Sequence, residues 1–217
     1  MTGRGDSIKS RPMDAGALAT LLSKPDCAAP DLSYAGLSAA GRHKVLLRAE
    51  QIEACPDNNA LFKLLAAELT ERLGAGEGDD LDVFLTRISQ IPIGLRAMAA
   101  VYQLDVSLTL DDLGWHFANW HHRGYCDATL WALGELGAHD HAAIFAEAYR
   151  QVQPFWNEIG TRWTRDFEDF VEWYGDSELD RLMRPLTERM RGLQEIDNGL
   201  FGFWTSYARK HPERVCG

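Results

Sequence analysis

Residues 104–138, LDVSLTLDDLGWHFANWHHRGYCDATLWALGELGA, decide the fold of this 217-residue chain. Apolar residues recur in this stretch at intervals of three and four, on both sides of a polar break at residues 121–125. Such spacing places apolar side chains on one face of a helix. We therefore expect two helices joined by a short corner and packed against each other as a central helical hairpin.

The rest of the chain also shows helical spacing, and no segment has the sustained alternation that is typical of strands. Residues 1–13 are expected to form a disordered tail, and residues 14–217 a single all-α domain with roughly nine helices around the hairpin. Ser177 is the predicted N-cap of one of them. Outside the hairpin, helices are expected at 15–23, 38–54, 60–73, 142–151, 179–193 and 200–211. A further helix is expected to start at 79–82, and another to start at Ile91-Pro92 and run into the hairpin. One more is expected to contain Trp163 and Tyr174 and to end at Gly175.

The composition indicates a folded protein with an acidic surface. The net charge is −10, and 46% of the residues are hydrophobic, which is ordinary for a globular chain. An acidic surface repels nucleic acid and anionic membranes, so neither is expected as a direct ligand. The chain has no apolar run long enough for a bilayer and no signal-peptide core, which predicts a cytoplasmic protein. The four Cys form no CxxC pair and are expected to be free thiols.

Acidic residues are concentrated at 166–180, which holds seven Asp or Glu and no Lys or Arg. Five of them recur at intervals of three or four, so a continuous helix would space their carboxylates about 5–6 Å apart. DNA phosphates along one strand have a similar spacing, so the row could enter a phosphate-binding groove. A solvated helix face that only maintains solubility fits the same pattern. With two shorter acidic segments, the candidate partner-binding residues are Asp79, Asp80, Asp82, Asp111, Asp112, Asp166, Glu168, Asp169, Glu172, Asp176 and Asp180.

Histidines near the corners of the hairpin raise an alternative, a metal-binding protein or an enzyme built on residues 116–141. Zinc sites usually show HExxH or paired CxxC spacing, and neither occurs here. No GxSxG motif or recognisable Cys–His pair indicates a hydrolase. Helix caps and surface hydrogen bonds account for the same residues, so no catalytic residue, metal or cofactor is predicted. The residues that the alternative would use are His116, His121, His122, Cys126, His139, Asp140 and His141.

Several motifs in a fixed order resemble one known family. The motifs are Ile91-Pro92-x-x-Leu95-Arg96, Val101-Tyr102-x-Leu104-Asp105, Phe117-x-Asn119, Ala132-Leu133-x-x-Leu136-Gly137-Ala138 and Tyr207-Ala208-Arg209-Lys210-His211-Pro212-Glu213. Together they are similar to the bacterial DNA-mimic-protein family, a helical domain otherwise of unknown function. The resemblance covers roughly residues 90–215 and divides the domain into N-terminal helices at 14–78 and a family-like region at 79–217.

The resemblance implies a dimeric, acidic protein that presents carboxylates in place of DNA phosphates to a DNA-binding regulator. One departure concerns a turn before the aromatic cluster, where the family usually has Asn-Gly-Gly-Phe and this chain has Leu110-Asp111-Asp112-Leu113. Glycines allow backbone conformations that Asp does not favour. The role of that turn is therefore not carried over to this chain.

These observations together predict a non-enzymatic protein-interaction module that forms a homodimer. Its acidic surface would bind a basic partner, such as a DNA-binding regulator or a nuclease, and so act as a DNA mimic or an inhibitor. Exposed aromatic residues favour a dimer or partner surface. The candidates for such exposure are Trp156, Trp163, Trp173 and Trp204.

Overall fold

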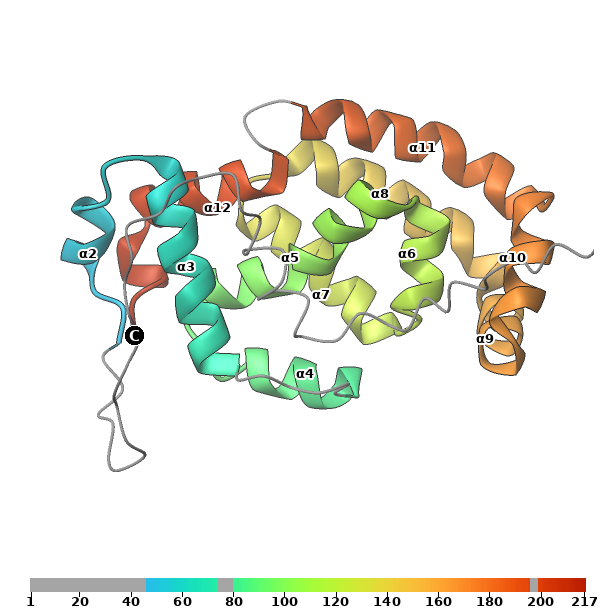
Figure 1. The fold of residues 1–217 in the computed structure, drawn as a ribbon, viewed down its shortest axis with the longest axis horizontal. Coiled ribbons are helices and arrows are strands. Elements are labelled where there is room, and N and C mark those ends of the chain that lie inside the picture. The colour runs from blue at the N-terminus through green and yellow to red at the C-terminus, as the bar shows by residue number, and fades with distance from the viewer. Residues whose placement is uncertain (1–45, 74–79, 196–198) are drawn as a thin grey trace, which may run out of the picture.

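The computed structural model describes residues 46–73, 80–195 and 199–217, and within these ranges the chain forms helices and no strand (Figure 1). The all-α prediction is therefore confirmed. The predicted tail at 1–13, the predicted helix at 15–23 and the first part of the helix predicted at 38–54 lie outside the described residues. The helices are α2 Ala49–Glu53, α3 Asn58–Leu73, α4 Leu81–Ile88, α5 Ile93–Leu110, α6 Leu113–Asn119, α7 Arg123–Glu135, α8 His139–Val152, α9 Trp156–Arg165, α10 Phe167–Gly175, α11 Glu178–Gln194 and α12 Gly199–Lys210, with short 3-10 turns at Gln153–Phe155 and Pro212–Arg214.

Helix α5 forms the centre of the molecule. It packs against α3, α4, α6, α7, α11 and α12, and most of its circumference is buried. A helix with partners on nearly every side has no need of a polar face, which explains its almost continuous apolar sequence. Within the described ranges, no helix combines the length and the apolarity needed to cross a bilayer.

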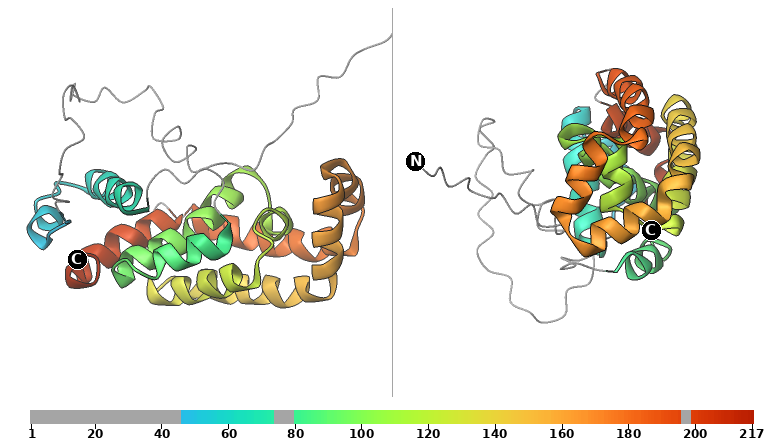
Figure 2. Two further views of the ribbon diagram at one scale, coloured as in Figure 1. Left: turned by 90° about the horizontal axis from the view of Figure 1, so that it is seen from below. Right: turned by 90° about the vertical axis from the view of Figure 1, so that its right-hand side faces the viewer.

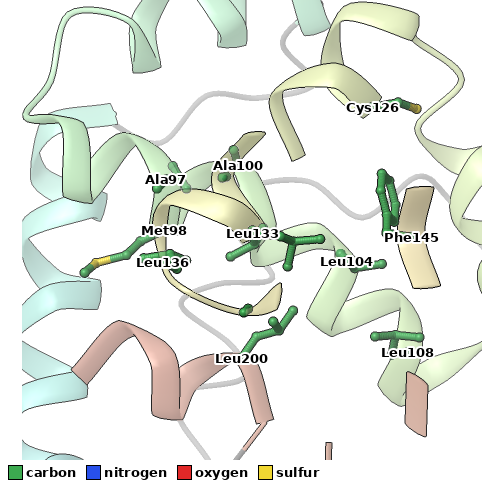
Figure 3. Packing of buried hydrophobic residues seen from close by; sticks show 14 of the residues in the cluster. Ala97, Met98, Ala100, Leu104, Leu108, Cys126, Leu133, Leu136, Phe145 and Leu200 are labelled. Carbon is green, nitrogen blue, oxygen red and sulfur yellow. The ribbon is translucent and has the colours of Figure 1, made fainter. Parts of the chain in front are cut away.

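The predicted hairpin is the pair α5 and α7. Small side chains at Ala97 and Ala100 let the two helices approach closely, and Leu133 of α7 belongs to the same buried cluster (Figure 3). The buried hydroxyls of Tyr125 and Thr129 each donate a hydrogen bond of 3.1 Å to the carbonyl oxygen of Ala100. Buried hydroxyls need such acceptors, so α7 is held to α5 by polar contacts as well as by apolar burial.

The first arm of the hairpin is broken where the apolar spacing suggested continuity. Helix α5 ends at Leu110, and Asp112 begins α6 as its N-cap, with its carboxylate accepting a hydrogen bond of 2.9 Å from the Trp115 amide. Asp is a strong N-cap because its carboxylate satisfies a backbone N–H that has no partner within the helix. The acidic pair therefore forms a corner of the fold.

A second break divides the helix predicted to end at Gly175. Helix α9 ends at Arg165, Asp166 is extended (φ −162°, ψ 131°), and its carboxylate accepts a hydrogen bond from the Glu168 amide at the start of α10. The predicted cap of the next helix is confirmed, because Ser177 Oγ accepts a hydrogen bond of 3.0 Å from the Asp180 amide. The residues of the 166–180 run thus belong to two helices and the turn between them.

The C-terminal motif holds the N-terminal helices to the core. Tyr207 donates a hydrogen bond to Glu135 at the end of α7, and Arg214 lies 2.9 Å from the same carboxylate. Arg209 donates to Asn58 Oδ1 and to the Cys55 carbonyl oxygen, each over 3.3 Å. Tyr207 and Arg209 of the motif, and Arg214 directly after it, therefore have structural contacts at the end of the molecule opposite α9 and α10 (Figures 1 and 2).

Gly114 is required where α6 meets α10. A Cβ atom at this position would lie 2.1 Å from the hydroxyl oxygen of Tyr174, whose side chain is buried and cannot move away freely. We expect Gly114→Ala to lower the free energy of unfolding by about 1–3 kcal/mol, the usual cost of overpacking, as measured by urea denaturation.

Gly134 provides the matched control for this substitution. It lies inside α7, and a Cβ atom there would meet nothing within 4 Å. Gly134→Ala should therefore raise the free energy of unfolding, by up to about 1 kcal/mol, through helix propensity. Equal stability of the two variants would contradict the close contact between α6 and α10.

His116 makes stability depend on pH. It is fully buried beside Phe117, Tyr125 and Phe145, its Nδ1 lies 3.0 Å from Ser107 Oγ, and burial lowers its pKa to about 3. The unfolded chain binds a proton at this residue near pH 6.5, and the folded chain does so only near pH 3. The stability contributed by the neutral ring is therefore complete above pH 6.5 and is lost as the pH falls toward 3.

We expect the free energy of unfolding of the wild type to fall by up to about 1.4 kcal/mol per pH unit more steeply than that of His116→Met across this window. Urea denaturation at a series of pH values measures the two slopes. His139→Gln, at an exposed position, should keep the wild-type slope. A His116→Met slope equal to that of the wild type would show that this ring does not remain neutral.

Candidate functional site

The 166–180 run lies at one end of the molecule, on α10 and the start of α11 (Figure 1). Helix α10 turns Phe170 and Tyr174 inward, where they pack with Trp115 of α6. Glu168 and Glu172 lie one turn apart on its exposed side, and Asp176 is exposed at its C-terminal end. In the described part of the chain, no ion pair involves any of these three carboxylates.

Two other carboxylates of the run are neutralised. Asp169 lies 3.1 Å from Arg162 and 3.4 Å from Arg165, both on α9. Asp180 is buried and pairs with Arg184 one turn further along α11. These arginines lie just outside the 166–180 run in the sequence. Counting only the acidic residues within the run therefore overstates the number of unpaired negative charges at the surface. The five carboxylates at intervals of three or four therefore do not form one continuous row of unpaired charge.

A long-range hydrogen bond brings a second acidic segment to α10. Tyr174 donates over 2.9 Å to the same Asp112 oxygen that caps α6. Burial and the adjacent Asp112 carboxylate raise the pKa of Tyr174, so the phenol remains a donor. Burial, and then the neighbouring charge of Asp112, also raise the pKa of Asp111. Residues 111–112 thus lie next to the 166–180 run, although no local pattern links them.

A cleft of about 250 Å³ lies at this junction. Arg191 of α11 lines the cleft and donates hydrogen bonds to the carbonyl oxygens of Leu108 and Asp111. Thr187, another lining residue, accepts a hydrogen bond of 3.1 Å from the Leu113 amide and so links α11 to the start of α6. The cleft is lined by Asp111, Asp112, Trp115, Asp180, Arg184, Thr187, Glu188 and Arg191. Its mixed charges suit polar contacts at the edge of an interface.

The remaining acidic segment lies elsewhere. Asp79 is outside the described residues, and Asp80 caps α4 by accepting a hydrogen bond of 2.9 Å from the Asp82 amide. Asp82 lies 3.1 Å from His122 Nε2 on the α7 side. Helix α4 packs on α5 and α7, away from α10 (Figures 1 and 2). Two of the three predicted segments therefore converge, and the described part of the third, Asp80 and Asp82, lies apart from them.

The histidines have separate structural environments. His116 is in the core, and His121 stacks on Trp156 with 4.2 Å between ring centroids while its Nε2 lies 2.8 Å from the Trp156 carbonyl oxygen. His122 caps α7 by accepting a hydrogen bond from the Tyr125 amide. Among the described residues, no group of three or more His, Cys, Asp or Glu could hold a metal ion. The convergence that the metal alternative requires is not observed there.

The exposed apolar side chains were not identified from the sequence. Of the four candidate tryptophans, Trp156 and Trp204 are buried, and Trp163 and Trp173 are half-buried. Phe167 and Val171 are instead 36% and 42% exposed on α10. A spacing of four between apolar residues is also typical of a buried helix face. Only the break at Asp166 and the position of Phe170 show which side of α10 faces inward.

Comparison with known proteins identifies the family. The family model described as DMP19-like protein matches residues 89–211, more than half of the chain and close to the region that carries the motifs. No curated protein and no solved structure matches the chain. With its helical architecture and the matched region, this chain belongs to the family of DMP19-like proteins, the DNA-mimic family that its motifs resemble.

Proposed function

We propose that this protein is a non-enzymatic interaction module that acts as a DNA mimic toward a basic, nucleic-acid-binding protein and inhibits it. We further propose that it works in the cytoplasm as a homodimer, without a cofactor and without direct contact to nucleic acid or membrane. Membership of the DMP19-like family supports the class of function. The observation that carries the proposal is the exposure of Glu168, Glu172 and Asp176, which we call the α10 acidic surface.

The α10 acidic surface has the properties that a phosphate substitute needs. Glu168 and Glu172 are separated by one helical turn, which places such side chains about 5–6 Å apart. Because no described cation pairs with them, their charge is available to a partner. The helix that carries them is fixed from behind by the buried Phe170 and by the hydrogen bond from Tyr174 to Asp112. A fixed array loses little conformational entropy on binding.

The contacts of the candidate binding residues support a division of roles among them. Asp169 and Asp180 pair with arginines, and Asp112 and Asp166 cap helices. These four carboxylates lie around the α10 acidic surface, and less of their charge is available to a partner. We therefore assign direct contact to the α10 acidic surface and a supporting role to Asp111, Asp112, Asp166, Asp169 and Asp180. Asp80 and Asp82 lie on α4 and belong to a separate patch.

Affinity capture on the immobilised wild-type protein, with elution by duplex DNA and by increasing salt, tests the proposal. We expect a basic protein to be retained at low salt and released by both treatments, because both compete for the same basic groups. Glu168→Gln/Glu172→Gln should weaken binding of the isolated partner about tenfold at low salt, as expected for the loss of two exposed charge contacts.

The control is Glu50→Gln/Glu53→Gln, which changes the net charge equally. Both residues are exposed on α2, at the opposite end of the molecule (Figure 1). This variant should bind the partner like the wild type. Equal weakening by both variants would indicate attraction to net charge alone, and retention that duplex DNA cannot reverse would exclude mimicry.

A further inference from the structure

Helix α10 exposes an apolar stripe beside its carboxylates. Phe167 and Val171 are 36% and 42% exposed and lie one helical turn apart, and we call them the α10 apolar ridge. Among the described residues, only on α10 do two large exposed apolar side chains have this spacing. Glu168 and Glu172 each follow a ridge residue in the sequence, so the acidic and apolar stripes run side by side along the helix.

The ridge is backed by a rigid aromatic cluster. The Phe167 ring lies 5.7 Å from the rings of both Trp115 and Trp163, and these two tryptophans pack edge-on against the buried Phe170. Trp115 also lines the cleft that contains Asp111 and Asp112. An aromatic centre with a polar border is the usual composition of a protein-binding hot spot.

We infer that the α10 apolar ridge is a docking contact for a basic protein segment in which apolar side chains lie beside Lys or Arg. The inference rests on the proposed function and adds to it the chemistry of the partner. Charge complementarity selects this occupant, because the ridge is bordered by unpaired carboxylates. A second copy of this chain, placed symmetrically on the ridge, would bring Glu168 and Glu172 of both copies together, which like charges oppose.

The α10 apolar ridge predicts that binding to this protein depends on salt less steeply than binding to DNA. Contacts to phosphates weaken steeply with salt, whereas burial of apolar surface does not. A partner that buries Phe167 and Val171 should therefore retain part of its affinity at salt concentrations that remove purely electrostatic binding.

Two synthetic peptides of equal length and charge serve as probes, one an amphipathic helix of Lys and Leu and the other of Lys and Ala. Isothermal titration of the full chain should show the Lys/Leu peptide binding about tenfold more tightly than the Lys/Ala peptide, a ratio that persists at high salt. Phe167→Ser/Val171→Ser should abolish this ratio and leave the affinity for the Lys/Ala peptide unchanged.

Val83→Ser is the matched control, because Val83 is 42% exposed on α4. It should keep the wild-type ratio. Val171→Ser alone, at the more exposed ridge position, should reduce the ratio of the two affinities. It keeps the test valid if the double variant does not fold, and the urea midpoint of the double variant shows whether it folds.

Equal affinity of the wild type for both peptides would overturn the ridge inference and leave the proposed function standing. Failure to bind either peptide would overturn both. Sedimentation velocity tests whether the ridge is instead a contact between two copies of this chain. If the wild type is a dimer and the serine variant a monomer, the ridge is covered by a second copy and the inference is wrong.

Discussion

The close packing of α7 against α5 is the constraint on which the rest of the structure depends. Small side chains on α5 bring the helices together, and the Ala100 carbonyl oxygen accepts hydrogen bonds from two α7 hydroxyls at their contact. Helices α6, α11 and α12 pack against α5, and α8 packs against α7. Helices α9 and α10 are held through their contacts with α6 and α11. Helix α6 turns away at Asp112, and that residue in turn holds α10 through Tyr174. The position of the acidic end of the molecule is therefore set by the core.

The candidate binding carboxylates that the structure describes differ in what they contact. Asp80, Asp112 and Asp166 accept hydrogen bonds from backbone amides at helix starts, and Asp169 and Asp180 pair with arginines. The α10 acidic surface has no such contacts within the described ranges. Net charge alone therefore overestimates the surface that could imitate DNA, and the contacts of each carboxylate locate it.

Much of the fold could be predicted from the sequence, because burial imposes a helical period on apolar residues. The all-α class, the central hairpin and the Ser177 cap follow from that period and from local capping chemistry. The helix breaks at Asp111–Asp112 and at Asp166 could not be predicted, because the apolar spacing continues across both positions. Local composition also missed the cations that flank the acidic run, and the contact between Asp112 and Tyr174 joins residues 62 positions apart. Sequence thus indicates which residues are charged, and long-range packing decides which charges remain available.

The separation between capping and exposed carboxylates has a consequence for how this family can diversify. Altering Asp112 disturbs a helix start and the anchoring of α10 together, whereas the side chains of Glu168 and Glu172 are exposed and form no ion pair with any described residue. Selection can therefore rewrite the exposed positions, one at a time, with little effect on folding. Under the proposed function, recognition of new partners can evolve on this helix while the scaffold beneath it is inherited unchanged.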